Sequence, residues 1–241
     1  MDATPQALVE PASGALADAP AAAPAPPRSA AQAEVLQAAA RSFMERGFAA
    51  ASIDDVARRM GATKGRVYHY YRAKLDLFVD VVRHGLEIIH RDVTAARVAA
   101  PDPATRMAAM VRAHLRSILL EQPFHRAALQ GVELHLTAAT TPDQREALAG
   151  VIALRDRHQR EFESALDEGV EAGVFAPCDV KLRARTLLAA LNGPVAWYRP
   201  RPNETDGDRD RLIDDIAGFA LAGLARQTLP ETLKNPKGRK S

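Results

Sequence analysis

The chain has 241 residues and a formal net charge of +2, and 47% of its residues are hydrophobic. A net charge this small excludes nucleic-acid binding through the whole surface, so such binding would need a local basic patch. The one cysteine, Cys178, excludes an internal disulfide and a metal site of the CxxC type.

Alanine is abundant, and no run of β-branched residues alternates at period two. These features predict an all-α fold of about nine helices. The N-terminus lacks the basic and apolar regions of a signal peptide, and no stretch approaches the roughly 20 apolar residues that span a bilayer. We therefore expect a soluble, cytoplasmic protein that makes no membrane contact.

Residues 1–29 consist mostly of Ala and Pro without helical periodicity, which predicts a disordered arm. The first helix is predicted to start after Ser29, as its N-cap, and to run to about Arg46. Gly47 follows as the C-cap, a position where a left-handed residue is favoured.

The next helix opens with a capping box, in which Ser52 is followed three residues later by Asp55. Gly61 is predicted to end this helix, and Thr63 to cap a third one. Within the third helix two residues four apart are expected to point inward. These two residues are Val67 and Tyr71.

Positive charge concentrates around the third helix. The window from Ala57 to Leu75 holds six Lys or Arg residues and no Asp or Glu. A helix-turn-helix places its second helix in the major groove, which requires a tight turn, a small residue at the contact and long donors on one side. The outward side of the third helix carries such donors: Lys64, Arg66, Tyr68, His69 and Tyr70. An ordinary solvated basic face on a helical hairpin would show the same composition and spacing, so both interpretations stay open at this point.

The rest of the chain shows further apolar periodicity of helical type. Pro101 and Pro103 are predicted to end the fourth helix and separate it from the fifth. The sequence Asn192-Gly193-Pro194 is expected to kink the eighth helix. The predicted spans are Lys74–Val98, Ala104–Glu121, Phe124–Leu136, Pro142–Gly173 with Thr141 as N-cap, Val180–Tyr198 and Arg209–Gln227.

The segments AARSFMERGF and SIDDVARRMGATKGRVYHYYRAK together resemble the N-terminal domain of TetR-family repressors, in detail from Ala31 to Leu77. The resemblance implies an all-helical dimer whose C-terminal domain binds a ligand and changes the spacing of two DNA-reading heads. Carried over residue by residue, it implies that Lys64, Gly65, Arg66, Tyr68, His69 and Tyr70 face DNA, while Ser52, Thr63 and Lys74 hold phosphates.

Three positions depart from the family pattern. Arg66 stands where a small residue is usual, so the base preference cannot be transferred from relatives. Arg66 is nevertheless the best candidate for reading a base, because a guanidinium bonds guanine O6 and N7 together. Tyr71 replaces a common phenylalanine, and Ala73 replaces a capping residue at the start of the fourth helix.

We therefore predict a disordered arm at residues 1–29, a DNA-binding domain at 30–77, a ligand-binding and dimerisation domain at 78–228, and a basic tail at 229–241. The segment EFESALDEGVEAGVFAPCDVKLRARTLLAALNGPVAWYRP is similar to a TetR subgroup that answers to acyl-CoA thioesters. Arg155 and Trp197 are candidate ligand residues. The alternatives are a solvated helix face for Arg155, paired with Asp156, and a place in the core or dimer interface for Trp197.

Catalytic and metal sites fit the sequence poorly. His84 and His90 are six residues apart and so lie on different sides of a helix. The other C-terminal histidines are scattered in sequence and are predicted to be structural: His114, His125, His135 and His158. We predict no catalytic residue, metal or cofactor, and hence no enzyme.

The prediction is a ligand-responsive transcriptional regulator, a repressor, which binds a palindromic operator as a homodimer. Its dimer seam would be Val180–Tyr198 and Arg209–Gln227, and a small apolar effector, an acyl-CoA or another apolar metabolite, would release it from DNA. One alternative is a DNA-binding dimer that responds to no ligand. The other is a small helical enzyme with an incidental basic stretch.

Overall fold

The computed structural model describes residues 28–137 and 141–225. The predicted arm, apart from Arg28 and Ser29, and the predicted basic tail lie outside the described residues. The described ranges form helices and no strand. The helices are α1 (Ala30–Ala50), α2 (Ile53–Arg59), α3 (Lys64–Tyr68), α4 (Lys74–Ala99), α5 (Pro103–Leu120), α6 (Gln122–Thr137), α7 (Pro142–Glu171), α8 (Val180–Asn192), α9 (Pro194–Trp197) and α10 (Asp206–Ala222).

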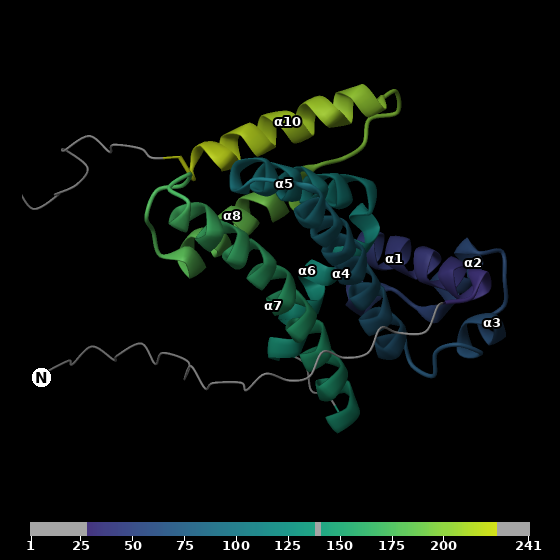
Figure 1. The fold of residues 1–241 in the computed structure, drawn as a ribbon. Helices are drawn as coiled ribbons and strands as arrows, with labels where there is room; N and C mark the ends of the chain where they lie inside the picture. Colours follow the sequence, from purple (N-terminus) through teal and green to yellow (C-terminus); the bar gives the residue numbers. More distant parts are fainter. Residues whose placement is uncertain (1–27, 138–140, 226–241) are drawn as a thin grey trace, which may run out of the picture.

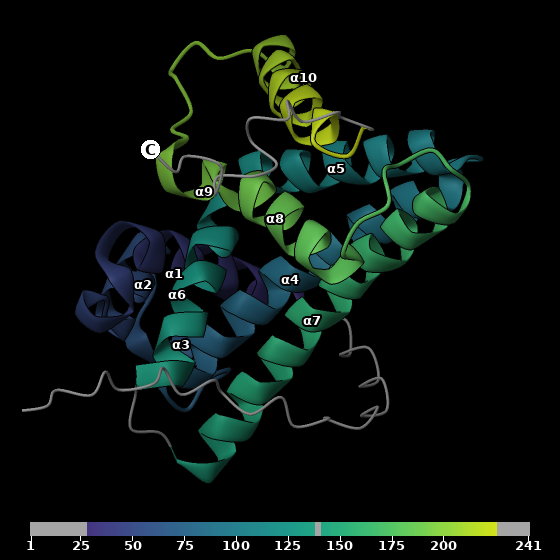
Figure 2. The ribbon, with the colours of Figure 1, turned by 90° about the vertical axis from the view of Figure 1, so that its left-hand side faces the viewer.

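Helices α1, α2 and α3 form a small group at one end of the molecule, and α5, α8 and α10 gather at the other end (Figure 1). The long helix α7 runs from beside α8 to the lower edge of the molecule (Figures 1 and 2). Helix α4 leaves the small group and packs against α5, α6 and α7. Helix α10 lies across α5 on the side away from the small group (Figures 1 and 2). The all-helical prediction is confirmed, and α8 with α9 corresponds to one of the nine predicted helices.

Two apolar clusters hold this arrangement together. The N-terminal cluster joins buried residues of α1, α2, α3 and the first part of α4, and it also takes in Phe124 of α6 and Leu148 of α7. The C-terminal cluster is built from α5, α7, α8, α10 and the second part of α4, where Ile89 and Val93 are buried. Helix α4 therefore belongs to both clusters. The predicted domain division after residue 77 falls inside this continuous helix and stays a proposal.

Local signals account for most helix starts. The Ser29 hydroxyl accepts a hydrogen bond from the Gln32 N–H at 3.2 Å, which is the predicted N-cap of α1. Gly47 has a φ of 75°, so the helix is interrupted where its C-cap was predicted. The chain then resumes helical geometry to Ala50, which extends α1 beyond the predicted end.

Several observed helix ends differ from the predicted ones for identifiable reasons. Pro103 begins α5 instead of only breaking the chain, because its missing N–H costs nothing at the first helical position and Asp102 caps the helix. At Asn192-Gly193-Pro194, where a kink is predicted, the eighth predicted helix divides into α8 and α9. Helix α10 starts at Asp206, earlier than predicted, because Thr205 forms a capping box with Asp208. It also ends earlier, at Ala222.

None of the helices in the described ranges combines the length and the apolar character that a membrane span requires.

Candidate nucleic-acid interface

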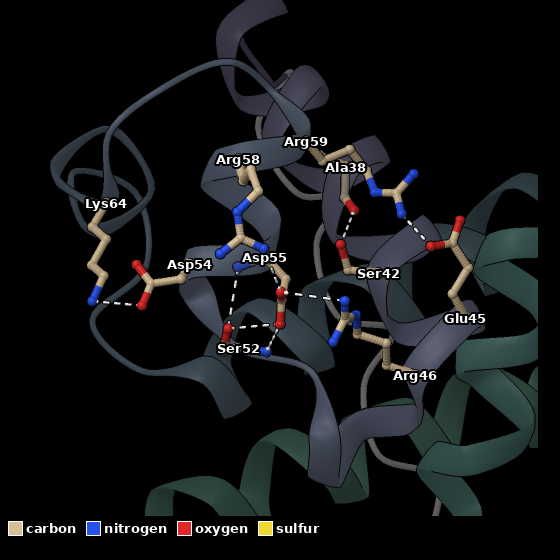
Figure 3. Close-up of polar contacts among 10 residues, drawn as sticks. All are labelled: Ala38, Ser42, Glu45, Arg46, Ser52, Asp54, Asp55, Arg58, Arg59 and Lys64. Atoms are coloured by element: carbon tan, nitrogen blue, oxygen red, sulfur yellow. Dashed lines mark hydrogen bonds and ion pairs between the residues drawn. The ribbon is translucent and has the colours of Figure 1, made fainter.

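The start of α2 is held by the predicted capping box (Figure 3). The Ser52 hydroxyl accepts from the Asp55 N–H at 3.1 Å and donates to Asp55 Oδ2 at 2.7 Å. The Ser52 N–H donates to the same carboxylate at 3.0 Å. The hydroxyl hydrogen bond is the main reason why the pKa of Asp55 is lowered. In the free protein both donors of Ser52 are therefore used by Asp55, and its predicted phosphate contact stays a prediction.

The turn between α2 and α3 depends on glycine. Gly61 has a φ of 62°, a left-handed conformation that other residues adopt only with strain. Thr63 is the N-cap residue of α3, as predicted, but its side chain makes no capping hydrogen bond. Gly65 differs from Gly61, because a Cβ at position 65 would lie 3.7 Å from Thr63 Oγ1, which is an ordinary contact and not a clash. The free protein does not require a glycine at position 65, which is consistent with close approach of an external partner.

Helix α3 has one buried side and one exposed side. Val67 has no exposed surface and Tyr71, just beyond the helix, is 6% exposed, as the four-residue spacing predicts. Tyr68 is 50% exposed. Tyr70 is only partly exposed, because it packs against the N-terminal cluster. The exposed predicted DNA contacts in this region are Thr63, Lys64, Gly65, Arg66, Tyr68 and His69.

The hydroxyl of Tyr71 explains why tyrosine is tolerated at a buried position. It donates to Asp80 Oδ2 at 2.6 Å and accepts from the Gln32 amide at 3.3 Å. The same carboxylate accepts from Arg28 at 2.8 Å. Burial and the neighbouring Asp80 raise the pKa of Tyr71. This polar network ties the starts of α1 and α4 to the end of the α3 turn.

The basic window is less unbalanced than its sequence indicates, which corrects the prediction of a free positive patch. Acidic residues from α1 and α2, which precede the window in sequence, lie beside its cations (Figure 3). Arg72 is the one cation of the window for which the described residues provide no ion pair or carbonyl partner. The pairs are Arg58–Asp55 at 3.1 Å, Lys64–Asp54 at 2.6 Å, Arg66–Glu34 at 2.5 Å and the close contact Arg59–Glu45.

Lys74 points back into the protein. Its ammonium donates to the carbonyls of Phe48, Ala49 and Ala51 at 2.8, 3.2 and 3.0 Å. It also lies 4.5 Å from the centroid of the Phe48 ring, within cation–π range. Lys74 thus joins the end of α1 to the start of α4. The phosphate contact that the resemblance implies for Lys74 stays a prediction.

Ala73 leaves the start of α4 without a side-chain cap, as expected. Half of a capping box remains, because Asp76 Oδ2 accepts from the Ala73 N–H at 3.1 Å. The contacts of Lys74 described above supply the further anchorage at this helix start.

The ion pair of Arg66 leads to a testable expectation. Glu34→Gln should raise the affinity for random-sequence duplex DNA by about two- to fivefold, because an exposed ion pair is worth roughly 0–1 kcal/mol and must break before Arg66 meets DNA. Fluorescence anisotropy at two salt concentrations measures this. Glu45→Gln is the matched control, since it removes the same charge from α1 but contacts Arg59. Equal gains in both variants would point to bulk charge and contradict the role of Glu34.

The candidate ligand residues lie at the surface. Arg155 is exposed, and its Nη2 lies 3.5 Å from Asp156 Oδ1, which fits a solvated helix face. Trp197 is 56% exposed, so the core position considered for it is wrong for the single protomer. The role of both residues in ligand binding stays a prediction.

Three of the four C-terminal histidines that are scattered in sequence lie close together in the fold, which sequence spacing does not reveal. The side chain of the fourth, His135, lies outside the described residues. His114, His125 and His158 are all at most 5% exposed. His114 Nδ1 lies 3.1 Å from His158 Nε2, and His114 Nε2 lies 3.2 Å from Asn192 Oδ1. His125 bonds Ser117 at 3.0 Å. The contacts of His114 join α5 to α7 and α8. The hydrogen bond between Ser117 and His125 joins α5 to α6.

Comparisons with known proteins agree with this geometry. Residues 35–81 match the family model "Bacterial regulatory proteins, tetR family", and residues 100–224 match "Tetracyclin repressor-like, C-terminal domain". The HTH-type transcriptional activator FasR of Mycolicibacterium smegmatis is 31% identical over 209 residues, 84% of this chain and 87% of FasR. The HTH-type transcriptional repressor KstR2 of Mycobacterium tuberculosis is 27% identical over 178 residues, 69% of this chain and 80% of KstR2.

A solved structure shares the fold. It is the crystal structure of AibR in complex with isovaleryl coenzyme A and operator DNA, with a TM-score of 0.64 and 21% sequence identity. The match covers 78% of this chain and 97% of AibR.

Proposed function

Because this chain belongs to the TetR family of bacterial transcriptional regulators, we propose that it represses its target genes as a homodimer on a palindromic operator and is released by a small apolar effector. Family membership makes it a DNA-binding transcriptional regulator and not an enzyme. Repression is supported by the similarity to KstR2, which is a repressor, whereas FasR is an activator.

The observation that carries the proposal is the exposed side of α3. Val67 is fully buried beneath it, while Lys64, Arg66 and Tyr68 are exposed on the helix. In a dimer two such helices would enter successive major grooves about 34–36 Å apart. Lys64 and Tyr68 would contact phosphates, and Arg66 would read a base edge after leaving Glu34.

The last helices support a dimer. Apolar side chains on them are exposed in the single protomer, where Leu182 of α8 is 63% exposed and Phe219 of α10 is 80% exposed. Large exposed apolar side chains on neighbouring helices are typical of an interaction surface. We propose that α8 and α10 pair with their counterparts in a second copy to form a four-helix seam.

The effector response depends on α4 in this proposal. Helix α4 starts beside the DNA-reading group, which is the small group of α1, α2 and α3, and continues into the C-terminal cluster. A shift of the C-terminal part of α4 would therefore move the DNA-reading group. An effector that prefers one position of α4 by a few kcal/mol would be enough to release DNA. The fold shared with AibR, whose complex contains isovaleryl coenzyme A, supports an acyl-CoA or a similar apolar metabolite.

Two measurements test the proposed function. A mobility-shift titration on the DNA upstream of the protein's own gene should show salt-sensitive binding, because Lys and Arg contacts release counterions. The absence of salt-sensitive binding to this DNA would contradict the proposal that it contains the operator. A thermal-shift screen with acyl-CoAs and other apolar compounds should give at least one stabilising ligand. A screen without any shift favours a DNA-binding dimer that responds to no ligand.

Arg66 and Tyr68 should differ in how they affect specificity. Arg66→Ala should relax the preference at one base pair of each half-site, worth about 1–3 kcal/mol, because a bidentate base contact is lost. Tyr68→Phe should weaken binding to all operators alike, since a phosphate contact carries no sequence information. Binding to a set of single-base operator variants measures both effects. Equal losses for Arg66→Ala on every variant would remove it from the base-reading role.

A further inference from the structure

Three buried side-chain atoms in the described residues have no hydrogen-bond partner, and all three lie on two helices that pack together, α4 and α7. They are His90 Nδ1, Thr94 Oγ1 and His158 Nδ1. His90 and Thr94 are one turn apart on α4, and the rings of His90 and His158 meet edge to face with centroids 6.1 Å apart. A buried polar atom without a partner destabilises a fold, so a concentration of such atoms in one place indicates a missing binding partner.

The hydrogen bonds around these atoms determine what that partner must offer. The His114 Nε2–H donates to Asn192 Oδ1, which leaves His114 Nδ1 as an acceptor for the His158 Nε2–H. Burial lowers the pKa of His114 to about 3 and that of His158 well below its usual value, so both rings are neutral. A neutral His158 that carries its proton on Nε2 has a bare lone pair on Nδ1. This buried nitrogen needs a hydrogen-bond donor.

We propose that the core polar cluster, defined as His90, Thr94, His114, His158 and Asn192, binds the hydroxyl group of an aliphatic effector. The hydroxyl donates to His158 Nδ1, and its oxygen accepts from the Thr94 hydroxyl. This inference rests on the proposed function and specifies the chemistry of its effector.

Other ligand chemistries fit the cluster less well. Carbonyl, ether and carboxylate oxygens carry no donor for His158, and an ammonium would place a charge in an apolar environment at high cost. That environment is provided by Ile89, Val93 and Phe162, all at most 3% exposed. The Phe162 ring centroid lies 5.4 Å from that of His158. A metal ion is not favoured either, because no group of three or more His, Cys, Asp or Glu residues in the described ranges is placed to hold one.

The position of the cluster connects effector binding with DNA binding. His90 and Thr94 lie on α4, which begins at Lys74 beside the end of α1. At 1.5 Å per residue, the distance along the helix from Lys74 to His90 is about 24 Å. A ligand held between His158 of α7 and Thr94 of α4 therefore acts on the helix that positions the DNA-reading group.

The experiment compares two probes that differ by one hydroxyl, 3-hydroxydecanoyl-CoA and decanoyl-CoA, by calorimetric titration of the full-length protein without DNA. The wild-type protein should bind the hydroxylated probe about tenfold more tightly, because a site built around a hydroxyl leaves polar groups unpaired with the other probe. Thr94→Val should abolish most of this preference and leave the affinity for decanoyl-CoA unchanged. Thr105→Val is the matched control, since Thr105 is exposed at the start of α5.

The thermal stability of the free protein gives a second readout. Thr94→Val removes a buried hydroxyl that lacks a partner, so the Tm should rise by about 2–4 °C. Equal binding of the two probes with a lower Tm for Thr94→Val would mean that the site holds a buried water only, and would overturn the proposal. Binding of neither probe would overturn it as well. Because the titration contains no DNA, a failure of operator binding would count against the proposed function and not against this site.

Discussion

Acidification from pH 7 to pH 5 should remove about 4 kcal/mol from the free energy of unfolding through His114 and His125 alone. Burial lowers the pKa of each ring to about 3. An unfolded histidine titrates near 6.5, so at pH 5 each ring contributes a loss of about 2 kcal/mol, at 1.36 kcal/mol per pKa unit. The sign follows from linkage, because the unfolded chain binds more protons than the native one throughout this interval.

Neighbouring groups act in both directions on the histidine region. His158 adds to the loss of unfolding free energy, because its pKa is lowered as well. Burial is the main cause of this lowered pKa, and the neighbouring His114 and His90 lower it further. For His90 burial is again the main cause of the lowered pKa, opposed by Glu161 and assisted by Arg157. The expected loss is a large part of the roughly 5–15 kcal/mol that stabilises a typical protein.

Urea unfolding at pH 7, 6 and 5 measures this dependence. His125→Gln should reduce the slope of the unfolding free energy against pH by about one proton, while keeping a side chain that can bond Ser117. His69→Gln is the control for the exchange of histidine for glutamine, made at an exposed position beyond the end of α3. A wild-type unfolding free energy that stays constant from pH 7 to pH 5 would show that the three rings are not buried in neutral form.

Lys74→Met should lower the free energy of unfolding by about 2 kcal/mol and the Tm by about 4–8 °C. Methionine keeps most of the aliphatic stem but loses the ammonium that bonds the carbonyls of Phe48, Ala49 and Ala51. The end of α1 would then lose its attachment to α4, and α2 and α3 would be less well placed. We therefore expect operator affinity to fall about tenfold, with little change in the salt dependence of binding.

Arg72→Met separates this structural role from a phosphate contact. It removes the same charge from an exposed residue that has no ion pair in the described part of the chain. Its Tm should stay within about 1 °C of the wild type, because surface substitutions of this kind rarely exceed 0.5 kcal/mol. If Lys74→Met instead keeps the wild-type Tm and lowers the salt slope by about one, Lys74 is a phosphate ligand and its internal contacts contribute little.

Local sequence patterns were sufficient wherever a structure depends on residues close together in the chain. The capping box of Ser52 and Asp55 and the glycine turn at Gly61 depend on contacts within four residues or on one backbone conformation. The four-residue spacing of Val67 and Tyr71 likewise predicts that they share one side of the chain, and both are buried. Each of these signals is carried by residues that are neighbours in the chain, so helix starts, turns and the all-helical fold could be predicted from the sequence. Composition and spacing alone left a helix-turn-helix and a solvated basic hairpin both open, and the resemblance to TetR-family repressors decided between them.

Features that join distant residues required the tertiary structure. The partner of Arg66 is Glu34 of α1, and the carbonyls that bind Lys74 follow the interruption of α1 at Gly47. His114 and His158 are 44 residues apart in sequence and meet only because α5 packs on α7. Neither charge pattern nor helical periodicity contains these distances, since both describe one helix at a time. The packing of helices on one another therefore decided which cations are paired before DNA binds, and it brought buried histidines together around an atom without a partner.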